Sequence, residues 1–431
     1  MPARSAVAFI TLGCPKNEVD SDRMRADVLA SEYNVVTDTE QADVVVLNTC
    51  AFISDAVEEA VAEILELAAW KHAREGRSVI VTGCLPSRYE PELSAELPEV
   101  DVFLPVAEEG SLLSALSSLT GGSSKRGTGP GRTVEGPTAY LQISDGCDRR
   151  CAYCTIPSIR GPHASRPFAD VLVEAAELVS AGARELVLVG QDVSAYGRDL
   201  PARRTLAELV TAVAALPGEY RVRLMYLQPD GVTDGLLSAI AESPRVCRYL
   251  DIPIQHASAS VLRRMGRSGD AASLASLFGR VRSVLPGVTL RTTVMAGFPG
   301  EARADALELE RFLDAAKLDF VGVFAFSPEE GTRACALEAQ VPKRTRIARA
   351  QRLRDIADAA GIAKAAELVD SEQMVLVEGS DDEGVCVGRT CGQAPEIDGL
   401  TLLDTKVQPG TFVRVRVVAS ELYDLIGEVL S

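Results

Sequence analysis

Residues 144–154, "SDGCDRRCAYC", place three cysteines within eight positions and contain no fourth. Cys147, Cys151 and Cys154 are separated by three and by two residues, and the next candidate ligand is His163, in the loop-like stretch "IRGPHASRP". A structural metal site normally closes with four protein ligands. Three thiolates on a 4Fe–4S cluster leave one iron without a protein ligand. We therefore expect a metal centre with one position open to a small molecule; the alternative is a zinc site completed by a distant histidine.

Length and composition favour an ordinary multidomain globular protein. The chain has 431 residues, of which 47% are hydrophobic and 24% are charged, enough for two or three domains. The apolar runs are too short to span a bilayer. The N-terminus "MPARSAVAFITLGC" faintly resembles a lipoprotein signal, but its apolar stretch is short and Pro15 follows the cysteine. We expect a cytoplasmic protein that does not insert into a membrane.

Ten cysteines and a net charge of −17 restrict the partners of the chain. In a reducing cytosol, clustered cysteines bind metal or carry out redox chemistry more often than they form disulfides. Strong acidity argues against broad affinity for nucleic acid, which depends on Lys and Arg neutralising phosphates. It suits a basic protein partner.

Three further cysteines follow strand-like runs in the first 105 residues. The runs "AVAFITLG", "DVVVLNT" and "SVIVTG" end directly before Cys14, Cys50 and Cys84, and residues 54–76 show helical spacing that ends at Gly76. Strands alternating with helices predict a parallel sheet, and ligands gather at the carboxyl ends of its strands. The three cysteines can therefore converge; the alternative for each is packing as a small apolar residue.

A second α/β region follows a flexible stretch. Residues 117–136 are rich in Gly, Ser and Thr, which is typical of a linker between domains. Six strand-like runs follow, separated by helical patterns: "AYLQIS", "ELVLVG", "RVRLMY", "YLDIPI", "TLRTTVM" and "FVGVFAF". Six such units predict an incomplete barrel with its active face at the strand carboxyl ends. The triple-cysteine loop directly follows the first of these strands.

The last 60 residues predict a small β-barrel. A helical segment, residues 343–369, leads into short strand-like runs separated by Gly, Pro and Asp turns. From residue 371 to 431 there are eleven Asp and Glu against four Lys and Arg. This barrel is acidic, whereas an RNA-binding barrel is usually basic.

The segment "CDRRCAYC" resembles the signature of the radical S-adenosylmethionine (SAM) superfamily. This resemblance implies that the open iron chelates SAM and that an electron from the cluster cleaves SAM to a 5′-deoxyadenosyl radical. It places Tyr153 near the adenine. It also implies SAM contacts from "VGQD", "IPIQHAS" and "AGFPGE", at strand ends. The cofactor-binding residues implied in these stretches are Gly190, Gln191, Asp192, Gln255, Gly297 and Glu301. "VGQD" departs from the usual Gly-Gly-Glu, which puts individual roles there in doubt.

The three-part organisation resembles the methylthiotransferases over essentially the whole chain. The resemblance divides it into an N-terminal domain (4–118), a linker (119–135), an incomplete (β/α)6 radical SAM barrel (136–365) and a terminal TRAM β-barrel (368–431). It implies two 4Fe–4S clusters, one ligated by Cys147, Cys151 and Cys154 and an auxiliary one. The auxiliary cluster, which delivers sulfur, takes Cys14, Cys50 and Cys84 as ligands. No catalytic side chain beyond these cluster ligands is implied.

The residues that surround the cysteines and later strand ends favour the RimO branch of this family. "TLGCPKNEVDSDRM", "LNTCAFISDAVEEA" and "FAFSPEEGT" resemble that branch, although Glu18 stands where an apolar residue is expected. The resemblance implies methylthiolation of an aspartate β-carbon in small-subunit ribosomal protein S-twelve, either free or within the subunit. It implies an electron donor such as flavodoxin or ferredoxin and a monomeric enzyme. The alternatives are a tRNA adenosine methylthiotransferase and a noncatalytic iron–sulfur sensor or assembly protein.

Four cysteines remain outside the predicted clusters. Cys247, Cys335, Cys386 and Cys391 show no ligand-like spacing, and we interpret all four as structural.

Overall fold

The computed structural model describes residues 4–90, 92–127, 129 and 131–430, in two compact units. The N-terminal unit contains the chain up to Thr133 with residues 145–149 and 154–164, and the remainder forms the C-terminal unit. Residue 91 of the predicted N-terminal domain, residues 128 and 130 of the predicted linker, and residue 431 of the predicted terminal barrel lie outside the described residues. No helix in the described part of the chain is long and apolar enough to cross a membrane.

A parallel five-stranded sheet in the order β2-β1-β3-β4-β5 organises the N-terminal unit. The strands are β1 (Ala6–Thr11), β2 (Asn34–Val36), β3 (Val44–Thr49), β4 (Ser78–Gly83) and β5 (Val102–Pro105). The helices are α1 (Pro15–Leu29), α2 (Ser54–His72), α3 (Cys84–Tyr89), α4 (Glu92–Glu96) and α5 (Leu112–Thr120), with short helical turns η1 (Thr39–Gln41) and η2 (Val106–Ser111). The predicted parallel sheet is confirmed. Its two edge strands were not predicted, because they are too short to show a pattern.

The central strand β3 explains why this sheet is covered on both faces. Every residue of β3 is buried, and "VVVLNT" is a nearly continuous apolar run, which is typical of a parallel strand with helices on both sides. Alternate β3 residues enter two separate apolar clusters, Val45 and Leu47 in one and Val44 and Val46 in the other. The carboxyl ends of the strands remain as the edge where loops gather.

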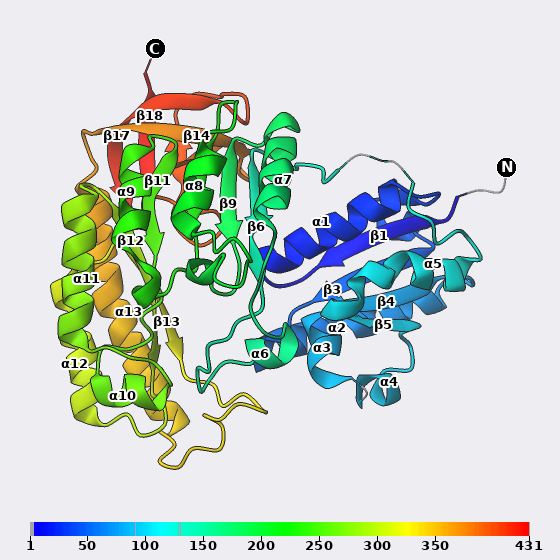
Figure 1. Ribbon diagram of the computed structural model, residues 1–431, viewed down its shortest axis with the longest axis horizontal. Coiled ribbons are helices and arrows are strands. Elements are labelled where there is room, and N and C mark those ends of the chain that lie inside the picture. The colour runs from blue at the N-terminus through cyan, green and yellow to red at the C-terminus, as the bar shows by residue number, and fades with distance from the viewer. Residues whose placement is uncertain (1–3, 91, 128, 130, 431) are drawn as a thin grey trace. The chain divides into compact units, whose positions relative to one another are not determined.

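Six parallel strands form the main sheet of the C-terminal unit, in the order β6-β9-β10-β11-β12-β13 (Figure 1). They are β6 (Thr138–Gln142), β9 (Glu185–Val189), β10 (Arg221–Leu224), β11 (Val246–Asp251), β12 (Thr289–Ala296) and β13 (Phe320–Ala325). The helices are α6 (Ile156–Ile159), α7 (Phe168–Ser180), α8 (Leu206–Ala214), α9 (Asp234–Glu242), α10 (Ala259–Arg264), α11 (Ala271–Val284), α12 (Arg303–Ala316) and α13 (Lys343–Ala366), of which α6 belongs to the N-terminal unit. Short elements are β7 (Ser144–Asp145), β8 (Ala164–Ser165), η3 (Val193–Ala195) and η4 (Pro229–Gly231). Spatial order follows chain order and the sheet stays open, which confirms the predicted incomplete barrel.

The chain ends in a closed five-stranded barrel, in the order β14-β15-β16-β18-β17. Its strands are β14 (Glu372–Ser380), β15 (Cys386–Thr390), β16 (Thr401–Leu403), β17 (Phe412–Glu421) and β18 (Asp424–Val429). The predicted small β-barrel is confirmed. Closure pairs every strand on both sides, so no strand is left as an unpaired edge.

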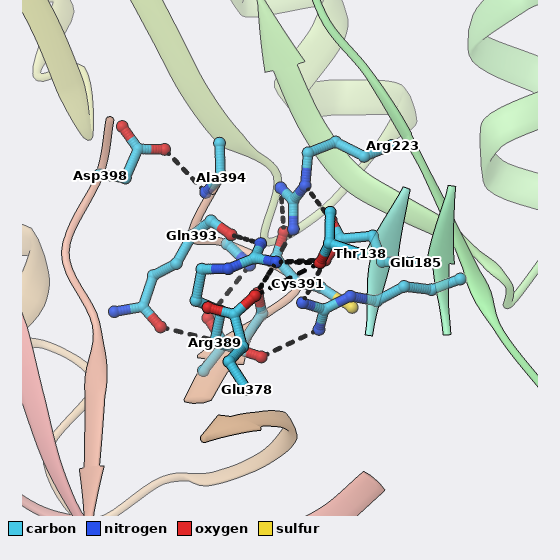
Figure 2. A network of polar contacts seen from close by, with 12 residues as sticks. Thr138, Glu185, Arg223, Glu378, Arg389, Cys391, Gln393, Ala394 and Asp398 are labelled. Atoms are coloured by element: carbon cyan, nitrogen blue, oxygen red, sulfur yellow. Dashed lines mark hydrogen bonds and ion pairs between the residues drawn. The ribbon is translucent and has the colours of Figure 1, made fainter. Parts of the chain in front are cut away.

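Buried charges join this barrel to the main sheet of the same unit (Figure 2). The carboxylate of Glu185 at the start of β9 is fully buried and contacts Arg221, Arg223 and Arg389 at 2.8, 2.5 and 2.8 Å. Burial by itself would raise the pKa of Glu185, but the three guanidinium groups outweigh it and hold that pKa well below its ordinary value. Since Arg389 lies in β15, the barrel docks through this carboxylate.

Candidate active site

Three cysteines stand at the carboxyl edge of the N-terminal sheet. Cys14 caps the start of α1, Cys50 directly follows β3, and Cys84 is the first residue of α3. β1, β3 and β4 are neighbouring parallel strands, so their ends lie side by side. The Cys84 thiol is close enough to those of Cys14 and Cys50 for their charges to affect its pKa.

Two glycines allow the loops that carry these cysteines to pass close together. Gly13 has a φ of +104°, and a Cβ on it would lie 2.6 Å from Cys50 Cβ and 3.3 Å from Cys50 Sγ. Gly83 has a φ of +94°, and its Cβ would collide with Asn48 and with the backbone of Thr49. Any larger residue would therefore be strained in its own backbone and would displace the neighbouring loop.

Paired asparagines fix the loop beneath Cys14. The Cys14 thiol donates to Asn17 Oδ1 at 3.3 Å, and Asn17 Nδ2 donates to Asn48 Oδ1 at 3.0 Å and to the carbonyl of Thr49 at 2.9 Å. Asn48 returns a hydrogen bond to the carbonyl of Asn17 at 2.9 Å. Both side chains are fully buried. Satisfied amide networks of this kind hold loops rigidly.

Arg160 is a buried cation close to Cys84 and Cys50. Its guanidinium group is almost wholly buried and pairs with Asp20 at 2.8 Å and with Asp145 at 3.3 Å, all within the N-terminal unit. Its positive charge lies close enough to the Cys84 thiol to lower the pKa of that thiol. Glu109 lies nearby, and burial together with the charge of Asp20 raises its pKa to about 8.

Burial favours the protonated form of the Cys50 and Cys84 thiols. It raises the pKa of Cys84 to about 11, although Arg160 opposes the shift, and it raises the pKa of Cys50. Among the described residues, no three His, Cys, Asp or Glu side chains are spaced to enclose a bare metal ion. Three adjacent thiols that ionise when they bind iron nevertheless match the donor chemistry of an iron–sulfur cluster.

The loop of residues 147–154 is divided between the two units, and each part makes its contacts within its own unit. In the N-terminal unit, the Cys147 amide donates to the carbonyl of Gly161 at 3.1 Å. Cys154 belongs to that unit and Cys151 to the C-terminal unit. There the Ala152 amide donates to the carbonyl of Met265 at 2.8 Å. The amino-acid types match a cluster with three protein ligands.

Two further contacts in the C-terminal unit define the second half of this loop. Arg267 Nη1 lies 3.9 Å from Cys151 Sγ. The Tyr153 ring stands edge-on to Phe298, with 6.5 Å between ring centroids. Tyr153, for which we predicted contact with SAM, therefore packs against the loop that carries Gly297.

Unpartnered polar atoms collect near the strand ends of the main sheet. Gln191 follows β9, and both its amide nitrogen and its amide oxygen are buried without a hydrogen-bond partner in the described part of the chain. The same holds for Ser144 Oγ, Gln228 Oε1 and His256 Nε2, which lie beyond β6, β10 and β11. A buried polar group normally has a partner. This edge therefore suits a polar ligand such as SAM.

The other predicted residues of this edge serve different purposes. Gly190 lies against Ser144, whose Oγ would be 2.6 Å from a Cβ on Gly190. Asp192 is buried and accepts a hydrogen bond from Ser194 at 2.5 Å. Gln255 has a left-handed φ of +67°, an uncommon conformation for a residue with a side chain.

Glu301 is occupied inside the protein. Its Oε2 accepts hydrogen bonds from the amides of Gly297 at 2.6 Å and Phe298 at 3.2 Å, and its Oε1 pairs with Arg349 at 2.7 Å. Gly297 has a φ of +76° and lies against Arg346. The carboxylate thus shapes the "AGFPGE" loop rather than presenting free oxygens.

Several polar residues of these sites were not predicted from the sequence: Arg160, Asp20, Asn17, Asn48, Gln228 and Arg267. None has a spacing that marks it. The one signal in the sequence is position, because Arg160 lies six residues after Cys154 in the loop-like stretch that contains His163.

Three stretches of the chain match known protein families. Residues 6–105 match the uncharacterized protein family UPF0004, residues 141–313 match the Radical SAM superfamily, and residues 369–430 match the TRAM domain. The fold and the cysteine loop thus define a radical SAM protein.

Curated relatives specify the family. The chain is 40% identical to ribosomal protein uS12 methylthiotransferase RimO of Geobacter sulfurreducens, over 100% of this chain and 99% of the relative. It is 43% identical to RimO of Syntrophus aciditrophicus, over 99% of both chains, and 44% identical to RimO of Desulforudis audaxviator, over 99% and 97%. The chain belongs to the RimO family of methylthiotransferases.

Solved structures show the same fold at low identity. The radical SAM methyltransferase TsrM of Kitasatospora setae, with cobalamin and a [4Fe-4S] cluster bound, matches with a TM-score of 0.57 and 14% identity over 75% of each chain. The cobalamin-dependent radical SAM enzyme OxsB matches with a TM-score of 0.53 and 13% identity, over 82% of this chain and 56% of that one. These likenesses concern the fold alone.

Proposed function

We propose that this chain is a radical SAM methylthiotransferase that adds a methylthio group to the β-carbon of an aspartate in ribosomal protein uS12. The observation that carries the proposal is the placement of Cys14, Cys50 and Cys84 at one edge of the N-terminal sheet, in a chain that also contains the triple-cysteine loop. A radical enzyme without a second cluster would not need the first set. The three domains are those expected above: 4–118, 136–365 and 368–431.

Cys147, Cys151 and Cys154 hold one 4Fe–4S cluster, and Cys14, Cys50 and Cys84 hold the other. When bound, the clusters and SAM supply the electron, the hydrogen-abstracting radical and the methyl-bearing sulfur. The buried thiols give up their protons as they take up iron. Arg160 would then stabilise the Cys84 thiolate, because its buried positive charge lowers the pKa of that thiol.

Protein groups orient SAM at the carboxyl edge of the main sheet. The unpartnered amide of Gln191 can both donate to and accept from the polar end of SAM. Tyr153 packs beside the adenine. Glu301 acts through the loop that it shapes, and the left-handed Gln255 fixes the turn after β11. Together these side chains would fix the orientation of SAM, which a reaction between precisely placed atoms requires.

Charge supports a protein substrate. Ribosomal proteins are basic, and an acidic terminal barrel on a chain of net charge −17 attracts them and repels tRNA. A ribosomal substrate places the reaction in the cytoplasm. A small reducing protein such as flavodoxin or ferredoxin delivers the electrons, and one chain holds both clusters, so the enzyme acts as a monomer.

Mass spectrometry of both candidate substrates tests this proposal. The reconstituted, reduced protein is incubated with SAM, sulfide and purified uS12, and in parallel with bulk tRNA. We expect one methylthio group on an aspartate of uS12, no methylthio-adenosine in the tRNA digest, and loss of the product with Cys151→Ala. Cys335→Ser, a change at an exposed cysteine outside both sets, is the matched control and retains activity.

The possible results of this experiment distinguish an error in the proposed substrate from an error in the proposed reaction. Modified tRNA with unmodified uS12 would overturn the substrate and retain the reaction. Cleaved SAM with neither product would overturn the acceptor. If Cys14→Ala left methylthiolation intact, the auxiliary cluster would have no part in sulfur delivery.

A further inference from the structure

Two adjoining cavities lie where the terminal barrel meets the amino-terminal ends of β12 and β13. One has a volume of about 380 Å³ and the other of about 260 Å³, and Phe320 and Tyr423 line both. Every residue that lines them belongs to the C-terminal unit. The candidate SAM-binding residues follow the carboxyl ends of the main sheet, so these cavities lie at its opposite edge. Together they form a groove, which we call the junction groove.

A fixed aromatic pair separates the two cavities. The ring of Phe320 in β13 stacks on that of Tyr423, which directly precedes β18, with 5.6 Å between the ring centroids. The Tyr423 hydroxyl donates to Asp358 Oδ1 of α13 at 2.8 Å. Gly361 of the same helix leaves room for this ring, because a Cβ there would collide with Tyr423. The sheet, the helix and the barrel thus hold the dividing wall in place, as in a preformed binding site.

The larger cavity is negatively charged. Its described lining includes three carboxylates, Asp358, Asp398 and Asp424, and one guanidinium group, Arg291. Arg291 is already paired inside the protein, with Asp251 at 3.2 Å and with Asp398 at 3.4 Å. The charge of Arg291 is therefore balanced, and Asp358 and Asp424 leave the cavity negative. A Lys or Arg side chain of a partner would meet opposite charge there.

Large apolar side chains also line this cavity. Ile397 and Leu422 are 47% and 65% exposed. Leu422 has a left-handed φ of +53°, which is a strained conformation for a bulky residue. Lys and Arg each combine an apolar stem with a charged head. Exposed apolar residues beside carboxylates therefore match both parts of such a side chain.

The smaller cavity contains an unsatisfied hydrogen-bond donor. Gln393 lines it and is 3% exposed. Its Oε1 accepts from the Thr390 amide at 3.0 Å and from the Thr401 hydroxyl at 2.8 Å, which fixes the orientation of the side-chain amide. Its Nε2 is buried and has no partner among the described residues, and Figure 2 shows this nitrogen pointing away from the buried charges. A buried donor normally has an acceptor, and the carbonyl of a bound peptide would supply one.

We propose that the junction groove docks a basic, extended segment of the protein substrate. A Lys or Arg side chain enters the larger cavity, and an apolar side chain enters the smaller one, beside Val288 and Leu368. A backbone carbonyl of the segment accepts the hydrogen bond from Gln393. This docking site rests on the proposed function, which makes uS12 the substrate.

The position and charge of the groove restrict what docks there. Because the groove and the candidate SAM site lie at opposite edges of the main sheet, the docked segment is not the one that carries the modified aspartate. The carboxylates of the larger cavity repel the phosphate groups of RNA. The groove therefore adds affinity and selectivity for a basic protein without blocking the site of reaction.

Binding of uS12 without turnover tests the docking site. Fluorescein-labelled uS12 is titrated with the full-length, iron-loaded protein, without reductant, at about 150 mM salt. Asp358→Asn with Asp424→Asn removes two charges from the larger cavity and retains the hydrogen bonds that both side chains accept through Oδ1. We expect this variant to raise the Kd about tenfold. Asp382→Asn with Glu383→Gln removes two exposed charges of the barrel outside the groove and should raise the Kd less than about twofold.

Photo-crosslinking identifies the docked segment. Benzoylphenylalanine replaces Leu422, which is exposed beside the larger cavity, and the irradiated complex with uS12 is digested and sequenced. We expect a crosslink to a uS12 peptide that contains Lys or Arg, and none to that peptide when the photoreactive residue replaces Asp382. In a separate incubation with bulk tRNA we expect no crosslink at position 422. A crosslink to tRNA and none to uS12 would assign the groove to RNA and overturn the proposal.

The titration also separates this docking site from the proposed function. Equal weakening by the two double variants would overturn the docking site, because overall charge would then account for the binding. Methylthiolation of uS12 that binds the parent chain and the variant of Asp358 and Asp424 equally would also overturn it, and would leave the proposed function intact. Binding of uS12 through the groove without methylthiolation would support the docking site and overturn the proposed reaction.

Discussion

At the scale of single residues, Gly13 shows how closely the loops at the N-terminal sheet edge approach one another. Its left-handed φ would strain any other residue, and its missing side chain leaves room for Cys50. The two effects can be separated, because Gly76 also has a left-handed φ, of +84°, and no atom within 4 Å of its Cβ position. Strain alone acts at Gly76, and strain plus collision acts at Gly13.

Gly13→Ala is therefore expected to lose the auxiliary cluster. The new methyl group displaces Cys50, so that after reconstitution the variant holds about half the iron of the parent chain, one of two 4Fe–4S clusters. Iron and sulfide per chain are the measurement. Gly76→Ala should cost about 1 kcal/mol of unfolding free energy and retain full iron. Full iron in Gly13→Ala would show that Cys50 is not a ligand.

His256 gives stability a pH dependence of its own. Burial lowers its pKa to about 4 from an ordinary value of 6.5, and the charge of Asp305 opposes the shift only in part. The unfolded chain binds a proton at this histidine below pH 6.5, and the folded chain does so only below about 4. Its contribution to stability is therefore complete above pH 6.5 and is lost as the pH falls from 6.5 to 4.

The expected loss reaches about 3 kcal/mol across that window. Urea unfolding at several pH values, with equal iron loading, measures it. His256→Gln should show a shallower decline than the parent chain. His72→Gln, at an exposed position at the end of α2, should follow the parent. Parallel pH curves for all three proteins would contradict this assignment.

At the scale of elements, Glu185 binds β9 to β10 and both to β15. Removing its charge leaves three buried guanidinium groups without their shared partner, and breaking a buried ion pair from one side costs about 3–5 kcal/mol. Glu185→Gln retains the shape of the side chain and should lower the unfolding free energy by that amount in urea. Glu310→Gln, in a partly exposed pair with Arg352 at 3.4 Å, should cost less than about 1 kcal/mol.

A small effect of Glu185→Gln would mean that the barrel does not depend on this carboxylate. Protease sensitivity of residues 366–372, between α13 and β14, would then show whether the barrel still docks. Normal resistance together with normal stability would contradict the role given to Glu185.

At the scale of the whole molecule, net charge controls the encounter with uS12. Association of an acidic enzyme with a basic protein is steered by long-range attraction, which salt screens within a Debye length of about 10 Å at 0.1 M. We expect the association rate to fall by about tenfold or more between roughly 50 and 300 mM salt, with a smaller change in dissociation. Stopped-flow fluorescence with labelled uS12 measures both rates.

The exposed turn between β14 and β15 provides the matched variant. Asp382→Asn with Glu383→Gln removes two exposed charges of the terminal barrel and should reduce the salt dependence. A rate that is independent of salt in the parent chain would exclude steering as the reason for its acidity.

The order of the two α/β regions and the terminal β-barrel can be predicted from the sequence alone, as can the strands that end in cysteines; the metal ligands stay a prediction. Buried parallel strands such as β3 are continuous apolar runs, and the spacing of cysteines is a local property. Both can therefore be recognised in the amino-acid sequence. Edge strands such as β2 were missed because a three-residue strand shows no period.

Which distant side chains meet depends on the folded structure. The pairs Arg160–Asp20 and Glu185–Arg389 each join residues on different elements, and no local pattern encodes such pairs. Their energies depend on burial, which multiplies electrostatic interactions that would be weak in water. Burial follows from how the sheets, helices and barrel pack, and that is fixed only when the whole chain has folded.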